Sequence, residues 1–209
     1  MRVIAGTARG THLLSVKGEK TRPVLDSVKE ALFNIIREVV PGSNVVDLFA
    51  GTGALGIEAL SRGASFCIFI DKDRHAVEVI KKNLLKAGLH ERAHVLRLDV
   101  FKACSYLLNV GATLGLPLLD LVLAGPPYEM VEQAEGRGRI LSLFQEMVEK
   151  GILKSDGMIA LQHRRGTLQR APTICIPDLE IFDQRCYGET QLTFLRVTSD
   201  ERQATSNGK

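Results

Sequence analysis

The sequence predicts an α/β fold built on a doubly wound, mostly parallel seven-stranded sheet. Short apolar runs alternate with stretches of helical periodicity, which is the pattern of parallel strands joined by crossover helices. The last two apolar runs are separated only by the residues GET, so they predict an antiparallel hairpin, because a parallel pair needs a long connection. The predicted strands are 44–49, 65–70, 93–98, 118–124, 158–162, 179–187 and 191–197.

Helices are predicted in the connections where apolar residues recur at intervals of three and four. One helix covers 54–62, directly after the first strand. The next begins after Asp73, whose side chain is suited to cap it, and ends at Gly88. A further helix near 140–150 leads into the fifth strand.

Residues 1–42 are predicted to form an extension that precedes the sheet. Apolar residues flank AGTARGT, which indicates a small hairpin, and a helix follows it. Ser27 and Glu30 form a Ser-x-x-Glu capping box at the start of that helix, and a Pro-Gly pair ends it. We expect the main domain to cover 43–198, with a disordered tail over 199–209.

Composition narrows the classes of function. The chain has 27 Lys and Arg against 24 Asp and Glu, and this mildly basic balance permits a nucleic-acid partner. Its four cysteines form no CxxC pair, which favours reduced thiols in the cytosol. The start lacks the apolar stretch of a signal peptide, and no run approaches the roughly 18 residues of a membrane span. The histidines show no metal-ligand spacing, so we expect a cytoplasmic protein that binds no metal and enters no membrane.

The first strand ends in a turn that is typical of nucleotide-like ligands. Gly51, Gly53 and Gly56 spell GxGxxG, and glycine lets the backbone approach a ligand closely. The same motif occurs in dinucleotide-dependent dehydrogenases, and a glycine turn can also serve packing alone. Asp47 would repel a pyrophosphate, whereas it could accept a hydrogen bond from the cationic amino group of S-adenosylmethionine, which carries no phosphate.

The second and third predicted strands also end in acidic residues. Asp71 follows the glycines by about 20 residues, where a carboxylate can accept both ribose hydroxyl groups. The alternative for Asp71 is a helix cap, a role for which Asp73 is better placed. Asp99 is suited to receive the amino group of adenine, so the acids at successive strand ends favour an adenosine-containing ligand.

The fourth strand ends in Gly125-Pro126-Pro127-Tyr128. Two prolines make the backbone rigid just after the strand. Tyr128 offers a flat face on which a base could stack, a contact worth about 1–3 kcal/mol in single-strand binders. The alternative is a structural turn with a half-buried tyrosine.

Basic residues gather in three clusters at or near these strand ends. A run of charge can simply be a solvated face, but three such clusters favour contacts with phosphate groups. The clusters are Arg2, Arg9, Lys17, Lys20 and Arg22; Arg137 and Arg139; and His163, Arg164, Arg165 and Arg170.

Taken together, these motifs resemble the class I S-adenosylmethionine-dependent methyltransferases. GPPY is similar to the (D/N/S)PP(Y/F/W) motif of enzymes that methylate exocyclic amino groups of bases. Four blocks narrow the resemblance to the bacterial 16S ribosomal RNA guanine-N2 methyltransferase family, over nearly the whole chain. These blocks are MRVIAGTARGTHL, TRPVLDSVKEALFNII, VVDLFAGTGALGIEALSRGA and YGETQLTFLR.

The resemblance implies a Rossmann-like methyltransferase sheet, S-adenosylmethionine as cofactor, and 16S rRNA or the small ribosomal subunit as partner. We expect a monomer acting on a splayed or looped guanine, because base edges inside an RNA helix are hard to reach. The cofactor residues implied are Asp47, Phe49, Gly51, Gly53, Asp71, Lys72, Asp99 and Val100, and the catalytic loop is Gly125, Pro126, Pro127 and Tyr128. RNA contacts are expected at Arg9 and Arg22 from the resemblance and at Arg164 and Arg165 from their charge.

One position departs from the family pattern. The family has Asp or Asn where this chain has Gly125, and that side chain would accept a hydrogen bond from the amino group being methylated. Losing one positioned polar group at a reacting centre costs about 100-fold or more in rate. The chain is then a weakened enzyme, an enzyme with another acceptor, or a cofactor- and RNA-binding homologue without catalysis; a one-base codon change from Asp is a fourth account. A DNA amino-methyltransferase would share the chemistry, but no separate target-recognition domain is visible.

Overall fold

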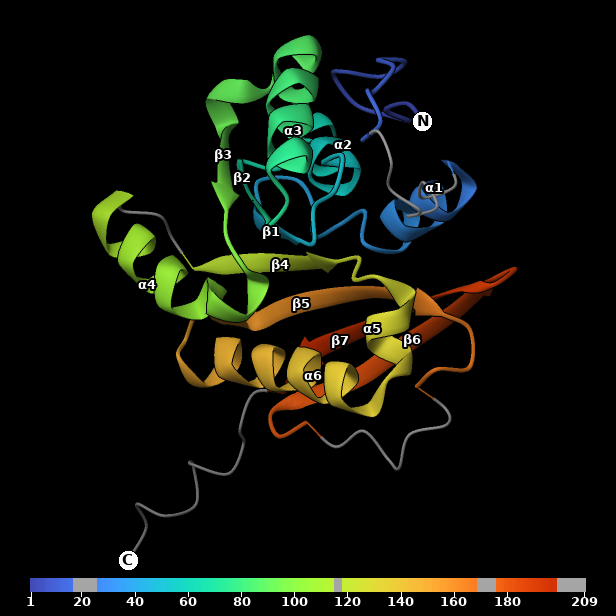
Figure 1. Ribbon diagram of the computed structural model, residues 1–209, viewed down its shortest axis with the longest axis vertical. Coiled ribbons are helices and arrows are strands. Elements are labelled where there is room, and N and C mark those ends of the chain that lie inside the picture. Colours follow the sequence, from blue (N-terminus) through green and yellow to red (C-terminus); the bar gives the residue numbers. More distant parts are fainter. Residues whose placement is uncertain (17–25, 115–117, 169–175, 199–209) are drawn as a thin grey trace, which may run out of the picture.

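A seven-stranded sheet runs through the computed structural model, which describes residues 1–16, 26–114, 118–168 and 176–198 (Figure 1). The strand order is β3-β2-β1-β4-β5-β7-β6. The order reverses between β1 and β4, which makes that junction the switch point of a doubly wound sheet. The strands are β1 (Asn44–Leu48), β2 (Phe66–Asp71), β3 (Ala93–Arg97), β4 (Leu119–Ala124), β5 (Leu153–Arg164), β6 (Leu179–Tyr187) and β7 (Thr190–Val197).

The directions of the strands confirm the predicted architecture. β1 to β5 pair in parallel, so that their carboxyl ends meet at one edge of the sheet. β6 and β7 form the predicted antiparallel hairpin, and β7 inserts between β5 and β6. The chain therefore has the mixed, mostly parallel sheet that the alternating pattern indicates.

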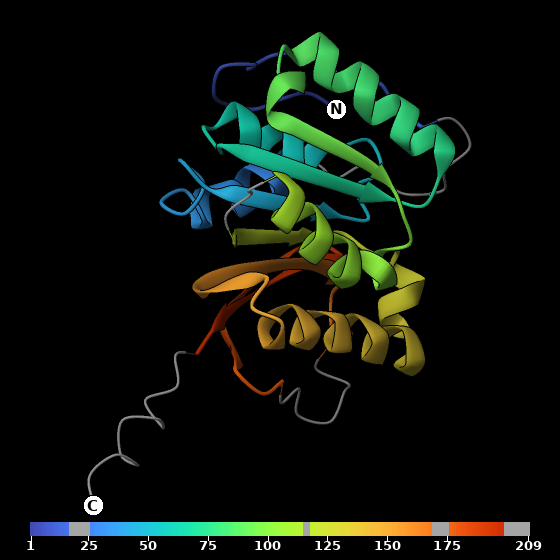
Figure 2. The same cartoon turned by 90° about the vertical axis from the view of Figure 1, so that its left-hand side faces the viewer.

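Helices cover both faces of this sheet (Figures 1 and 2). One face packs against α1, α2 and α3, and the other packs against α4 and α6, with the short α5 at the end of β4. The bounds are α1 (Asp26–Ile35), α2 (Ala54–Ser61), α3 (Arg74–Ala87), α4 (Ala103–Leu114), α5 (Tyr128–Glu132) and α6 (Ala134–Glu149), with 3-10 turns at His90–Arg92 and Val100–Lys102.

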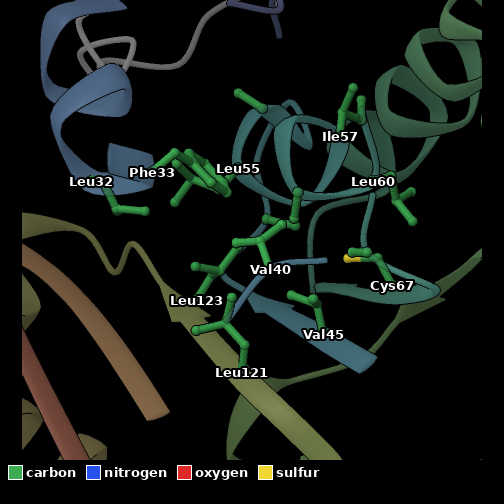
Figure 3. Packing of buried hydrophobic residues seen from close by; sticks show 14 of the residues in the cluster. Leu32, Phe33, Val40, Val45, Leu55, Ile57, Leu60, Cys67, Leu121 and Leu123 are labelled. Atoms are coloured by element: carbon green, nitrogen blue, oxygen red, sulfur yellow. The ribbon is translucent and has the colours of Figure 1, made fainter. Parts of the chain in front are cut away.

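Two apolar layers form the core, one on each side of the sheet. In the first layer, Phe33 of α1 and Leu55 of α2 pack above Leu121 and Leu123 of β4 (Figure 3). Successive strand residues enter opposite layers, since Val45 belongs to this layer and Val46 belongs to the second. Burial on both faces explains why the central strands are continuous apolar runs rather than alternating ones.

Several local predictions hold and others do not. The Asp73 side chain accepts hydrogen bonds from the N–H groups of His75 and Ala76, and Gly88 ends α3 with φ 68°, as predicted. The prediction that Ser27 caps α1 was wrong, because the helix already includes Asp26 and Ser27 lies in its first turn.

The structure also contains helices that the sequence pattern does not predict. α4 and α5 were not predicted; α4 exposes Tyr106 and Leu108 while burying Leu107, so its apolar residues do not mark one face. α6 and β5 are longer than expected, at Ala134–Glu149 and Leu153–Arg164. Glycines and charges at these ends mask the periodicity on which the prediction rested.

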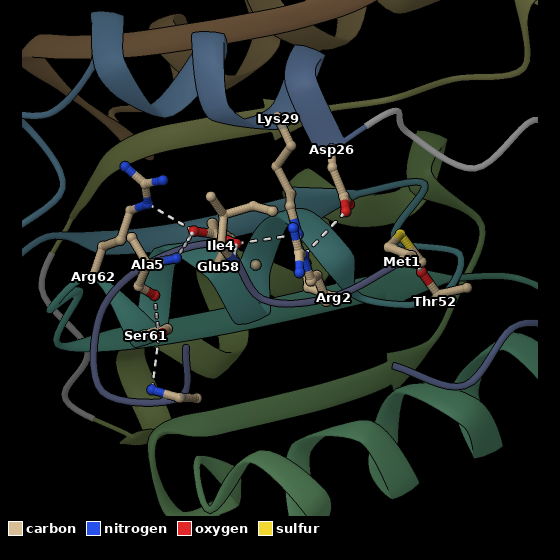
Figure 4. A network of polar contacts seen from close by, with 12 residues as sticks. Met1, Arg2, Ile4, Ala5, Asp26, Lys29, Thr52, Glu58, Ser61 and Arg62 are labelled. Atoms are coloured by element: carbon tan, nitrogen blue, oxygen red, sulfur yellow. Dashed lines mark hydrogen bonds and ion pairs between the residues drawn. The ribbon is translucent and has the colours of Figure 1, made fainter. Parts of the chain in front are cut away.

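The N-terminal segment is held against α2 by a buried carboxylate (Figure 4). Both Glu58 and Lys29 are fully buried, and Lys29 Nζ lies 3.1 Å from Glu58 Oε2. The same carboxylate accepts hydrogen bonds from the backbone N–H groups of Ile4 and Ala5 at 2.8 and 3.0 Å, and from Arg62 Nε at 2.8 Å. One acid thus joins the N-terminal segment, α1 and α2.

The predicted N-terminal hairpin is a single antiparallel bridge between Arg2 and His12 rather than a pair of strands. Val3, Ala8 and Leu13 enter the first apolar layer together with residues of α1 and α2. The extension therefore shares the core of the main domain. The predicted tail, 199–209, lies outside the described residues.

Candidate cofactor and RNA site

The predicted cofactor residues lie at the carboxyl ends of β1, β2 and β3, beside the switch point of the sheet. Doubly wound sheets bind ligands in the crevice at such a point. The register pairs Leu48 of β1 with Ile70 of β2, so that the loops following these two strands start side by side. The strand ends singled out in the sequence are thus neighbours in the fold.

The loop after β1 has a backbone shaped for close approach. Phe49, Gly51 and Gly53 all have positive φ, at 59°, 55° and 77°. Gly53 precedes α2 in the left-handed conformation, which costs glycine little. Phe49 is not a glycine, and strain of this kind clusters at ligand-binding loops.

The third glycine of the motif serves packing. A Cβ at Gly56 would lie 2.3 Å from the Phe69 ring and 2.7 Å from Cys67 Sγ, so α2 can approach β2 only with glycine here. Cys67 is buried and unpaired, as expected for a core thiol.

Asp47 is a buried acid at this loop. It is 2% exposed, and its Oδ2 accepts a hydrogen bond from Gly56 N at 2.8 Å. Burial raises the pKa of Asp47 to about 8; the Gly56 hydrogen bond opposes the rise and the nearby Asp71 adds to it. A cation placed at this loop would favour the ionised form.

Asp71 bridges the loops after β1 and β2. Its Oδ2 accepts a hydrogen bond from Gly51 N at 2.8 Å, and its Oδ1 accepts one from Asp73 N at 2.9 Å. Each carboxylate oxygen offers two lone pairs, so both retain capacity for a further donor. Lys72, the next residue, is exposed.

The loop after β3 presents one acid and two rings. Asp99 is exposed and its Oδ1 accepts a hydrogen bond from Phe101 N at 3.1 Å, while Val100 is buried. The Phe101 ring meets the Phe49 ring edge to face, with 6.3 Å between centroids. The Arg139 guanidinium lies 3.8 Å from the centroid of the Phe101 ring.

The sequence does not identify Phe101, whose ring contacts both Phe49 and Arg139 at this edge of the sheet. No local motif marks it, because its partners Phe49 and Arg139 come from distant parts of the chain. Arg139 was grouped with the basic cluster, and the structure stacks it on an aromatic ring instead.

The GPPY loop follows β4 at the same edge. A Cβ added at Gly125 would find only Leu55 Cδ1, at 4.0 Å, so the space above this glycine is open. Pro126 is buried and Pro127 exposed, and Tyr128 begins α5 half-buried. The Tyr128 hydroxyl group forms a 2.8 Å hydrogen bond with Thr190 Oγ1, which fixes the ring against the start of β7.

The predicted RNA contacts do not all come together. Arg164 and Arg165 are both exposed. The Arg164 guanidinium forms an ion pair with the Glu132 carboxylate at 2.9 Å, and its Cζ lies 5.7 Å from the centroid of the Tyr128 ring. Arg9 belongs to a loop bound to Ser61, at the end of α2 remote from the glycine turn. Arg22 lies outside the described residues.

The prediction that His163 belongs to the third basic cluster was wrong. It lies within β5, fully buried, and hydrogen-bonds Thr193 Oγ1 at 2.9 Å. Burial lowers its pKa, so it carries no charge for a phosphate group at neutral pH.

Two absences hold for the described residues, 1–16, 26–114, 118–168 and 176–198. No three His, Cys, Asp or Glu side chains gather there in a way that could hold a metal ion. Within the same ranges, no helix combines the length and the apolar character needed to cross a membrane.

Comparison with known proteins places this chain in a family. The family model described as conserved hypothetical protein 95 matches residues 1–196. "Putative rRNA methyltransferase YlbH" of Bacillus subtilis (strain 168) is 40% identical over 165 residues, which cover 79% of this chain and 83% of that protein. "Ribosomal RNA small subunit methyltransferase D" of Escherichia coli (strain K12) is 32% identical over 164 residues, covering 78% and 74% respectively. The solved structure of "Putative methyltransferase yhhF from Escherichia coli" has a TM-score of 0.75 at 26% identity, and the match covers 95% of this chain and 98% of that one.

Proposed function

This chain belongs to the conserved hypothetical protein 95 family, a family that includes methyltransferases, and we propose that it methylates the N2 amino group of a guanine in 16S rRNA. The methyl donor would be S-adenosylmethionine, and the rRNA would be free or assembled in the small subunit. The observation that carries the proposal is the alignment of three acids and the Pro-Pro-Tyr loop along consecutive strand ends. The relatives are named as a putative rRNA methyltransferase and as a methyltransferase of small-subunit ribosomal RNA, which supports rRNA as the substrate. An rRNA substrate would place the protein in the cytoplasm.

The residues at this edge fit the proposed donor. Burial is the main cause of the raised pKa of Asp47, and a cationic amino group bound beside this carboxyl group would favour its ionised form. The spare lone pairs of Asp71 suit two ribose hydroxyl groups. Asp99 would accept from the adenine amino group, with Val100 beside it. Bound there, the donor supplies an electrophilic methyl group on a sulfonium.

The residues at the end of β4 fit a base. The Tyr128 ring is fixed by Thr190 and offers an aromatic face. Arg164 and Arg165 are exposed nearby and would contact the phosphate groups of a splayed nucleotide. Orientation matters greatly, because the guanine amino group is a poor nucleophile and positioning can supply much of a rate enhancement.

Calorimetry with S-adenosylmethionine and with NAD tests the cofactor assignment. We expect binding of S-adenosylmethionine alone, weakened about 10- to 100-fold by Asp71→Asn, since hydrogen bonds to a charged group contribute about 1.5–3 kcal/mol. Asp156→Asn is the matched control, because Asp156 is exposed in the amino-terminal half of β5. Binding of NAD, or equal affinities for wild type and Asp71→Asn, would reject the assignment.

A second candidate is a binding protein that keeps the fold without turnover. Gly125 favours it, because this chain lacks the motif side chain that accepts from the target amino group. Normal binding of donor and RNA with no methylated product would support this candidate, whereas turnover by the unaltered chain excludes it.

A further inference from the structure

Gln162 of β5 is a buried polar side chain with an unsatisfied oxygen. It is 8% exposed, and its Oε1 is buried without a hydrogen-bond partner. Leaving such a group unpaired destabilises a fold, so its presence calls for a reason.

The register of the sheet places Gln162 beside Gly125. β4 and β5 pair in parallel up to Ala124 opposite Leu161, and the residues that follow this last pair are Gly125, just past the end of β4, and Gln162 of β5. Neighbouring strands lie about 4.8 Å apart. The unsatisfied amide therefore lies one strand away from the position at which the family pattern has Asp or Asn.

The side chain of Gln162 also points to the correct face of the sheet. It pairs with Leu192 of β7, and Leu192 lies in the same apolar layer as Leu123 and Ala160. A Cβ at Gly125 would lie nearest to Leu55 Cδ1, and Leu55 belongs to this same layer, so a side chain there would enter this same face. The open space above Gly125 is thus on the side to which Gln162 points.

The ring of Tyr128 is anchored at the same corner. Thr190, its hydrogen-bond partner, pairs with Arg164, which is two residues beyond Gln162 on β5. Alternate residues of a strand share one face, so Thr190 and Gln162 lie on the same side. The Thr190 anchor of the Tyr128 ring, the open space at Gly125 and the Gln162 side chain therefore lie on one side of the sheet near the end of β4.

We infer that Gln162 Oε1 accepts a hydrogen bond from the guanine amino group that is methylated, in the role that Gly125 cannot fill. This inference rests on the proposed function. The hydrogen bond orients the amino group so that its lone pair forms the new N–C bond to the methyl carbon. The C–S bond breaks with its electron pair going to sulfur, which loses its positive charge. The extra proton then passes from nitrogen to water, since an amide is too weak a base to hold it.

The test removes the acceptor without changing the size of the side chain. Gln162→Met should lower the rate of methyl transfer to 16S RNA at saturating donor about 100-fold. It should leave the unfolding temperature equal or higher, because an unsatisfied amide is replaced by an apolar chain of similar length. A structural role for Gln162 would lower the unfolding temperature instead. Gln145→Met is the control: its Oε1 is also buried without a hydrogen-bond partner but lies in α6, and this variant should transfer at the wild-type rate.

Gly125→Asp provides the rescue. In that background Gln162→Met should cost less than about 5-fold, because the new carboxylate supplies the acceptor. A wild-type rate in Gln162→Met, or a loss that Gly125→Asp does not reduce, would overturn the inference. If only the Gly125→Asp variants transfer methyl groups, the inference fails while the proposed function stands. If neither wild type nor Gly125→Asp transfers, both fail.

Discussion

At the glycine turn, Gly56 serves both the packing of α2 and the burial of an acidic residue, Asp47. Gly56 lets α2 touch β2, and its N–H group is the hydrogen-bond donor to the buried carboxyl group of Asp47. The sequence motif identifies both residues, but it does not distinguish the glycine that packs from the glycines that turn. That distinction depends on Phe69 and Cys67, which lie on another strand.

Gly56→Ala should destabilise the protein by about 1–3 kcal/mol, because the added methyl group meets the Phe69 ring at 2.3 Å. Urea denaturation measures the loss. Gly138→Ala is the control: it lies in α6 with nothing within 4 Å of an added Cβ, and it should stabilise by about 0.5–1 kcal/mol. Equal stability of Gly56→Ala and wild type would contradict the close packing of α2 on β2.

Asp47→Asn should change how stability depends on pH. With its pKa raised to about 8, the folded protein keeps a proton that the unfolded chain loses near pH 4. The free energy of unfolding of the wild type therefore falls as pH rises from 4 to 8, by at most about 1.4 kcal/mol per unit, and Asp47→Asn lacks this fall. Denaturation at pH 5, 6, 7 and 8 measures both proteins. Parallel pH profiles would show that Asp47 is ionised throughout.

At the scale of elements, the N-terminal segment depends on a charge network that the sequence does not reveal. Glu58 looks like an ordinary helix charge in the sequence, yet the fold buries it against Lys29 of α1 and the backbone of Ile4 and Ala5. Local patterns predict where helices lie, as they did for α2 and α3. They do not predict which charge is buried, because that depends on segments far apart in the chain.

Glu58→Gln should destabilise the protein by about 3–5 kcal/mol, because it leaves the Lys29 ammonium buried without its counter-charge. It should also release the N-terminal segment, so that limited proteolysis cleaves near residues 4–9 sooner. Glu38→Gln is the control, because Glu38 pairs with Arg37 at the surface. This substitution should change the free energy of unfolding by less than about 0.5 kcal/mol. Adding Lys29→Met to Glu58→Gln should restore part of the lost stability; if the two substitutions simply add, the ion pair contributes nothing.

At the scale of the whole molecule, the sheet brings together residues that the sequence presents one strand at a time. The alternation of strands and helices was sufficient to predict the parallel sheet, its hairpin and the acids at its strand ends. The site is less predictable where it depends on register: Gln162 acquires its place because the pairing of β4 with β5 ends with Ala124 opposite Leu161. Arg9 shows the opposite case. It belongs to a basic cluster in the sequence, but the fold holds its loop against Ser61, at the end of α2 that is remote from the glycine turn.

Identification of the methylated product tests the central claim most directly. Small subunits or 16S RNA lacking the modification would be incubated with the protein and labelled S-adenosylmethionine, then digested to nucleosides for mass spectrometry. The account predicts label in N2-methylguanosine at a single site, increased by Gly125→Asp. Label in another nucleoside or in ribosomal protein, or none with either protein although both bind the donor, would contradict it.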